Sequence, residues 1–179
     1  MGFRSEEATL KVTMGWLDIL TRTVLWLVLG PVLFAVLVPS ALLASRWQLL
    51  SYGIGSLRFI GIMPICLGAA VVLWCAWDFM VVGRGTPLLF DPPPRLVSRG
   101  LYRVVRNPMY IGVELILGGE AIAFESLILL AYAVGVWVMF HGIIIAFEEP
   151  YLRKTFGAAY EEYSKAVPRW VPRWKRAEG

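Results

Sequence analysis

Four long apolar stretches determine most of what this chain can fold into. They cover residues 24–44, 59–77, 108–124 and 126–147, and each contains at most two charged residues. A helix needs about 20 apolar residues to cross the hydrocarbon core of a bilayer, and about 17 at the least. The chain is also 58% hydrophobic and only 17% charged, which is more apolar than soluble domains are. The sequence therefore predicts an all-α, polytopic membrane protein with about four transmembrane helices.

The third and fourth stretches are separated by the single residue Glu125. We expect them to form a tight helical hairpin with Glu125 exposed at its tip. Pro31 and Pro39 are expected to bend the first stretch, so a neighbouring helix must satisfy the freed carbonyls. We interpret residues 1–179 as one domain, with two helices in 1–82 and the cofactor-binding, catalytic part in 83–179.

Positive charges indicate the orientation of the chain in the membrane. Lysines and arginines gather in the loop 83–107 and in the tail after residue 150. Because these residues mark the cytoplasmic side, we expect both segments and both termini to be cytoplasmic. Charges placed beside apolar spans also argue against nucleic-acid binding. Cys66 and Cys75 lie nine residues apart on one predicted helix, too far to pair, and no metal-ligand spacing is present.

The run Arg106-Asn107-Pro108-Met109-Tyr110 stands where the third stretch begins. Asn is a good N-cap and Pro is tolerated in the first helical turn, so the run is explained if Asn107 only caps the helix. The same helix end also presents free N–H groups and a partial positive charge. An anion site for the carboxylate of a methionine-like group is the functional alternative, with Tyr102 and Arg106 as further donors.

A second polar cluster, Glu148-Glu149, follows the fourth stretch. On a regular α-helix Glu148 lies nearly two turns after His141, so both are expected on one face. This face would run from a buried imidazole to a carboxylate at the membrane surface. The carboxylate could accept hydrogen bonds from a ribose diol or an ammonium group. Alternatively, the two acids mark a solvated helix end and the histidine only packs.

Several other polar residues fit either a structural or a functional role. Within the apolar stretches, the acids Asp78, Glu114 and Glu120 need partners in the protein interior. Gly118 and Gly119 are expected to allow close helix packing. In the tail, apolar residues at 152, 156, 160 and 163 have helical spacing. They predict an amphipathic helix on the membrane surface, followed by an aromatic and basic anchor with Trp170 and Trp174.

These motifs together resemble those of a family of integral membrane enzymes. The run from Gly100 to Gly112 is similar to the GxYxxxRHPxYxG motif of the isoprenylcysteine carboxyl methyltransferases. Glu148-Glu149-Pro150-Tyr151-Leu152, with the later Phe156-Gly157, Tyr160, Tyr163 and Val167-Pro168-Arg169, resembles the C-terminal signature of that family. Phospholipid methyltransferases are similar in having Gly-x-Gly before Glu-Glu, here Gly83-Arg84-Gly85 and Glu148-Glu149.

The resemblance implies S-adenosylmethionine as cofactor, bound in a pocket that faces the cytoplasm. The residues it implies for cofactor binding are Tyr102, Arg106, Asn107, Pro108, Met109, Tyr110, Gly112, His141, Glu148 and Glu149. The catalytic residues it implies are Glu148, Arg169 and Asn107, with Arg169 closing the pocket or holding the substrate. Asn107 replaces the family histidine, and asparagine cannot titrate near neutrality, so we expect it to bind and orient.

Two functions remain open from the sequence. The first is S-adenosylmethionine-dependent methyl transfer to a lipid-like or membrane-embedded acceptor, which is a carboxylate or an amine. A carboxylate acceptor needs mainly positioning, whereas an amine needs a base such as Glu148. The alternative is a non-enzymatic four-helix assembly factor or a small transporter subunit. The sequence gives neither the acceptor nor the oligomeric state.

Overall fold

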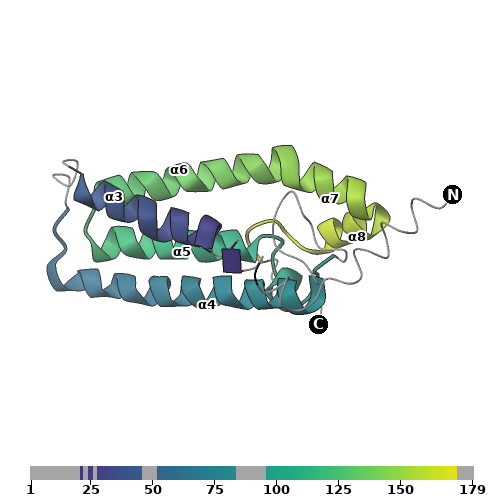
Figure 1. Cartoon of the computed structure of the whole chain (residues 1–179), viewed down its shortest axis with the longest axis horizontal. Helices are drawn as coiled ribbons and strands as arrows, with labels where there is room; N and C mark the ends of the chain where they lie inside the picture. Colours follow the sequence, from purple (N-terminus) through teal and green to yellow (C-terminus); the bar gives the residue numbers. More distant parts are fainter. Residues whose placement is uncertain (1–20, 22–23, 26–27, 46–51, 84–95, 173–179) are drawn as a thin grey trace, which may run out of the picture.

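The computed structural model of the chain describes residues 21, 24–25, 28–45, 52–83 and 96–172. Within these residues the regular elements are helices, as predicted (Figure 1). The main ones are α3 (Val38–Ala44), α4 (Ile62–Asp78), α5 (Pro108–Ala123), α6 (Leu127–Ile143), α7 (Glu149–Phe156) and α8 (Ala158–Ala166). α5 is central, because it packs against α4, against α6 and against the π-helical segment η1 (Val28–Leu37).

Prolines shape the first helix as the sequence predicts. η1 contains Pro31 and continues directly into α3, which has Pro39 in its first turn. In a π turn the carbonyl of Phe34 would accept a hydrogen bond from the N–H of residue 39. That residue is Pro39, which has no N–H. The hydroxyl of Tyr132 on α6 donates to this carbonyl instead, at 3.0 Å. The neighbouring helix therefore satisfies the carbonyl that the proline frees.

α4 and α5 approach each other closely at paired glycines. A Cβ on Gly119 of α5 would lie 2.6 Å from the carbonyl oxygen of Gly61 and 2.7 Å from a side-chain carbon of Ile65. Near the other end of α5, Gly112 faces Gly68 in the same way. The adjacent Gly118 has open space around it. Of the two glycines expected to permit close packing, only Gly119 does so.

The predicted hairpin of α5 and α6 is confirmed, but its tip is not exposed. Ser126 accepts a hydrogen bond from the N–H of Leu129 and caps α6, at 3.4 Å. Glu125 has a positive φ of 52° and is half-buried. Its carboxylate accepts a hydrogen bond from the N–H of Ile54 at 3.1 Å, so it secures the segment that precedes α4. The expectation of a solvent-exposed acid was wrong because a backbone donor lies within its reach.

In the part of the chain that the structure describes, two continuous helices are long and apolar enough to cross a membrane. They are Gly55–Val81, which contains α4, and Leu127–Phe156, which contains α6 and α7. Large apolar side chains on both are exposed, including Leu67, Trp74 and Val138. The segment Leu29–Ala44 is apolar but shorter. The surface of the bundle therefore has the character expected of a lipid-facing one.

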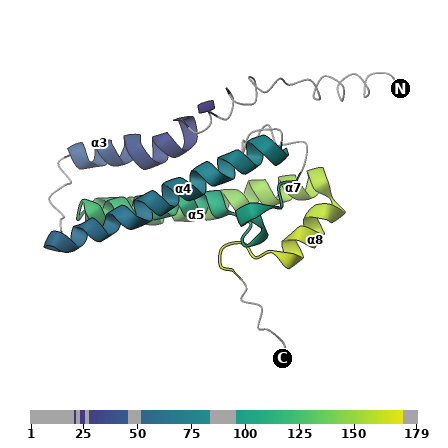
Figure 2. The ribbon, with the colours of Figure 1, turned by 90° about the horizontal axis from the view of Figure 1, so that it is seen from below.

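The helix that begins with α6 extends beyond the end of the fourth apolar stretch at residue 147. It continues through the π-helical segment η6 (Ile144–Glu148) into α7 without a break. It ends at Gly157, whose φ is +53°, and α8 then turns back toward the bundle (Figure 2). The single amphipathic helix predicted for the tail is thus two helices. Arg153 and Glu161 join them across the bend at 3.0 Å.

The glycine contact predicts opposite effects for two neighbouring substitutions. Gly119→Ala should destabilise the protein by about 1–3 kcal/mol, because its methyl group would overlap the backbone at Gly61. Gly118→Ala should be neutral or stabilising by up to about 1 kcal/mol, because it adds only helix propensity. Thermal unfolding of both variants in the same detergent measures the difference. Equal melting temperatures would contradict the close contact of α4 and α5.

Candidate functional site

The two polar runs of the sequence, 102–110 and 148–149, meet at one end of the bundle. The short 3₁₀ helix η5 (Gly100–Arg103) and the start of α5 lie there beside η6, α7 and the tail segment 167–172. This end lies opposite the turn between α5 and α6 (Figure 1). Segments far apart in the sequence are therefore brought together where the motifs predicted a site.

Asp78 of α4 holds the segment at Arg99 and Gly100, which leads into this site. Its side chain is buried, and Oδ1 accepts a hydrogen bond from Nε of Arg99 at 2.9 Å. Gly100 follows with a φ of +57°, and a Cβ there would overlap Oδ2 of Asp78. A glycine is thus required for both its backbone conformation and its small size. Asp78, whose role the sequence left open, has a structural partner.

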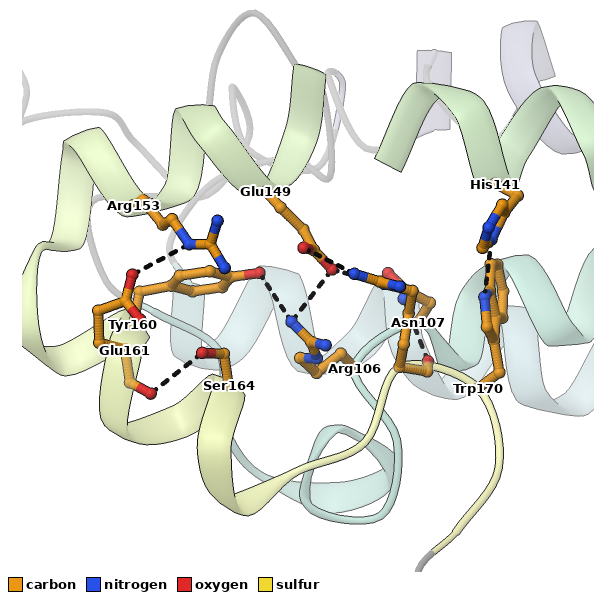
Figure 3. Close-up of polar contacts among 10 residues, drawn as sticks. Arg106, Asn107, His141, Glu149, Arg153, Tyr160, Glu161, Ser164 and Trp170 are labelled. Carbon is orange, nitrogen blue, oxygen red and sulfur yellow. Dashed lines mark hydrogen bonds and ion pairs between the residues drawn. The ribbon is translucent and has the colours of Figure 1, made fainter. Parts of the chain in front are cut away.

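Glu149 is the centre of the polar network (Figure 3). One of its carboxylate oxygens lies 3.1 Å from Nη1 of Arg106 and 2.7 Å from Nε of Arg169. The other accepts a hydrogen bond from Nη2 of Arg169 at 3.0 Å. This bidentate contact raises the pKa of the Arg169 guanidinium. Glu149 is only 6% exposed, and two arginines compensate its buried charge.

Backbone contacts join the tail to the start of α5. The side-chain amide of Asn107 donates to the carbonyl of Arg169 at 3.1 Å, and the N–H of Arg106 donates to the carbonyl of Pro168 at 2.8 Å. Asn107 occupies the N-cap position of α5, but its side chain makes no capping hydrogen bond. The capping interpretation was therefore wrong, because the amide turns to the tail instead.

Glu148 points to a different partner from its neighbour. Its carboxylate accepts a hydrogen bond from the hydroxyl of Tyr110 on α5 at 3.0 Å. The two arginines pair with Glu149 and not with Glu148. Two adjacent acids thus have separate environments, one paired with cations and one held by a phenol.

The expectation that His141 and Glu148 share a face was wrong. Pro150 has no N–H for the preceding turn, and the N–H of Glu149 bonds to Ile144, five residues back. This π turn adds about one residue to the helix register. In consequence His141 and Glu149 both point toward the tail, as Figure 3 shows. Pro150 was the signal in the sequence for this shift.

His141 contacts the tail through Trp170. The indole N–H of Trp170 donates to Nδ1 of His141 at 3.1 Å. The ring of Trp137, one turn earlier on α6, stacks on the imidazole with centroids 5.5 Å apart and planes 10° apart. Trp170 was predicted as part of a surface anchor, and here its indole nitrogen faces the protein. Trp174 lies outside the described residues.

The other predicted site residues have packing contacts. Met109 and Tyr102 belong to a buried cluster with Cys75 of α4, and Gly112 faces Gly68. Pro108 is buried at the start of α5. One carboxylate oxygen each of Glu114 and Glu120 is buried without a hydrogen-bond partner among the described residues. Arg84 and Gly85 of the Gly-x-Gly run lie outside the described residues, as does most of the proline-rich loop that follows them.

Two tyrosines of α8 support the network and were not predicted as site residues. Tyr160 is 1% exposed, and its hydroxyl accepts a hydrogen bond from Arg106 at 3.4 Å. The hydroxyl of Tyr163 donates to the carbonyl of Tyr102 at 2.8 Å. Burial raises the pKa of both tyrosines, which keeps them protonated. Their helical spacing had been interpreted as a membrane-facing stripe, although it turns them toward the bundle.

Comparison with known proteins identifies the family. A model of the phospholipid methyltransferase family matches residues 57–159, which is more than half of the chain and includes α4, α5, α6 and α7. The chain belongs to this family. The match covers the Asn107 and Glu149 ends of the polar network, while Arg169 lies beyond it.

Several curated proteins that are similar in sequence to this chain are named protein-S-isoprenylcysteine O-methyltransferases. A protein-S-isoprenylcysteine O-methyltransferase B of Arabidopsis thaliana is 37% identical over 79 residues, 44% of this chain and 40% of the relative. A protein-S-isoprenylcysteine O-methyltransferase of Schizosaccharomyces pombe is 36% identical over 43% of this chain and 33% of the relative. A probable one from rice is 27% identical over 64% of this chain and 60% of the relative. The chain thus spans less than two thirds of each, and no solved structure matches it.

The network predicts that Glu149→Gln releases the tail. The neutral amide keeps the shape of the side chain but loses the charge that holds two arginines, and a hydrogen bond to a charged group contributes about 1.5–3 kcal/mol. Exchange of the backbone amide hydrogens of residues 160–172 with solvent should become faster in this variant. Glu161→Gln is the control, because its ion pair with Arg153 is half-exposed. Unchanged exchange in the Glu149 variant would show that the tail is held by other contacts.

Proposed function

We propose that the chain is an S-adenosylmethionine-dependent methyltransferase that acts on a lipid-like or membrane-embedded acceptor. The main support is that a phospholipid methyltransferase family model matches the chain across the helices that form the polar network. The names of the relatives agree with methyl transfer to a lipid-linked group. The alternative of an assembly factor or transporter subunit has no comparable support.

The residues around the network fit the proposed cofactor. Nε of Arg106 is buried and has no hydrogen-bond partner among the described residues, so it can donate to the carboxylate of a methionine-like group. Among the described residues no arginine pairs with the carboxylate of Glu148, and this carboxylate suits the ammonium or the ribose diol. Asn107, Tyr110 and His141 would complete the binding residues. The cofactor supplies an electrophilic methyl group on a positively charged sulfur.

Glu148 has the clearest chemical role among the residues of the chain. With a carboxylate acceptor it needs only to bind and orient, because the acceptor is already a nucleophile. With an amine acceptor, one carboxylate oxygen of Glu148 can take the proton that the ammonium form loses. Tyr110 holds this carboxylate in place through its hydroxyl. Both residues are partly buried, which reduces the competition of water with the interactions made there.

Arg169 and Asn107 are proposed to close and orient the site. Asn107 donates to the carbonyl of Arg169, and the guanidinium of Arg169 is fixed by Glu149. Glu149 is therefore proposed as the group that organises the arginines, and Glu148 as the carboxylate that meets ligands. This division refines the expectation that both acids contact the cofactor.

We further propose four membrane spans with the polar end of the bundle in the cytoplasm. The two long apolar helices are supplemented by the η1–α3 segment and by α5, whose two acids each have one buried carboxylate oxygen. Arginines and lysines flank the polar end, as they do on the cytoplasmic side of membrane proteins. The acceptor would then reach the site from within the bilayer.

Cofactor affinity tests the role of Glu148. S-adenosylhomocysteine should bind the purified protein in detergent, and Glu148→Gln should weaken binding roughly ten- to a hundred-fold, as expected for a lost charged hydrogen bond. Isothermal calorimetry measures both values, with Glu161→Gln as the control. Absence of saturable binding to the wild type would contradict the methyltransferase proposal. It would favour the non-enzymatic alternative.

Cysteine labelling tests the orientation. Single cysteines at Lys165 in α8 and at Ser56, near the opposite end of the bundle, are introduced after Cys66 and Cys75 are replaced. An impermeant thiol reagent applied to intact cells should label position 56 and leave position 165 unlabelled, because only the former would face outward. The reverse pattern would invert the orientation, and labelling of both positions would contradict the proposed spans.

A further inference from the structure

His141, the single histidine of the chain, is held in a defined protonation state by the tail. Its Nδ1 accepts a hydrogen bond from the indole N–H of Trp170 at 3.1 Å. An indole nitrogen can only donate, and a ring nitrogen that accepts carries no proton. The imidazole in this arrangement is therefore neutral, and its proton is on Nε2.

Two indoles pack against the imidazole of His141, and one of them also determines which nitrogen carries the proton. Trp137 is nearly parallel to the imidazole, and the ring of Trp170 has its centroid 6.0 Å from that of His141 at an angle of 31°. Stacking sets the plane of the ring but is indifferent to which nitrogen is protonated. The hydrogen bond from Trp170 makes that choice.

The position of Trp170 depends in turn on the preceding residue. Arg169 is held by the carboxylate of Glu149 through two hydrogen bonds and by Asn107 through its carbonyl. Because Trp170 directly follows Arg169, the contacts that seat the tail on the start of α5 also place its indole beside His141. Figure 3 shows His141 and Glu149 facing this same tail segment from one side of the helix.

We propose that Trp170 is a positioning residue that locks His141 in the neutral Nε2–H tautomer. His141 then offers the site one N–H donor and no free basic nitrogen. It suits an oxygen of a bound ligand, such as a carboxylate or a ribose hydroxyl, and is unsuited to proton removal. The role of His141 toward a bound ligand rests on the proposed function, whereas the assignment of the tautomer does not.

Nitrogen NMR of the ¹⁵N-histidine-labelled protein in detergent tests the tautomer directly, because the spectrum contains one imidazole. In the wild type near neutral pH, Nε2 should carry the proton and Nδ1 should be unprotonated. Trp170→Phe keeps an aromatic ring but removes the donor, so the two nitrogen signals should move toward each other as both tautomers become populated. Trp137→Phe removes only the stacking indole and should retain the wild-type pattern.

Three results would overturn the proposal. They are a proton on Nδ1 in the wild type, a doubly protonated ring near neutral pH, and a Trp170→Phe spectrum identical to that of the wild type. The first two contradict the assigned tautomer, and the third contradicts the role of Trp170. None of them depends on whether the chain transfers methyl groups.

Two substitutions of His141 test the donor role. His141→Gln keeps an N–H donor but cannot act as a base, whereas His141→Leu has neither property. Affinity for S-adenosylhomocysteine should stay close to wild type in the former and fall by roughly tenfold in the latter, as for one lost hydrogen bond. Equal losses in both variants would contradict the donor role. If the wild type binds no S-adenosylhomocysteine, the proposed function fails, and the NMR spectra still decide the tautomer.

Discussion

The buried carboxylate of Glu149 is the interaction on which the polar end of the protein depends. It joins α7 to the start of α5 through Arg106 and to the tail through Arg169. Each hydrogen bond to this charged group contributes about 1.5–3 kcal/mol, so the loss of its charge would leave both arginines without compensation. The tail contacts of Asn107 and Trp170 lie on the same segment as Arg169.

Pro150 gives the adjacent acids their different surroundings. The π turn that accommodates this proline sends Glu149 toward the tail and Glu148 toward Tyr110. Glu149 is then engaged by the two arginines, and Glu148 is the carboxylate that we propose for contact with a ligand. A pair of identical neighbouring residues thus supplies both a structural group and a proposed chemical one.

The sequence was most informative where hydrophobic pattern decides structure. The helices, the hairpin and the proline effect near Phe34 followed from apolar length and from the missing N–H of Pro39. Faces were less predictable, because the π turn rotates the helix after His141 and no regular spacing anticipates it. The capping alternative for Asn107 and the surface-anchor role of Trp170 were both local, although each residue bonds to a segment distant in sequence. Long-range partners of this kind depend on how helices pack, which a single sequence does not specify.

We propose that this polar end carries out methyl transfer to a membrane-embedded acceptor. The most direct test is transfer of a radiolabelled methyl group from S-adenosylmethionine to lipid extracted from membranes that contain the chain. We expect a labelled lipid-soluble product with the wild type and a large loss of label with Glu148→Gln. Label incorporated equally by both proteins, or by neither above membranes that lack the chain, would contradict it.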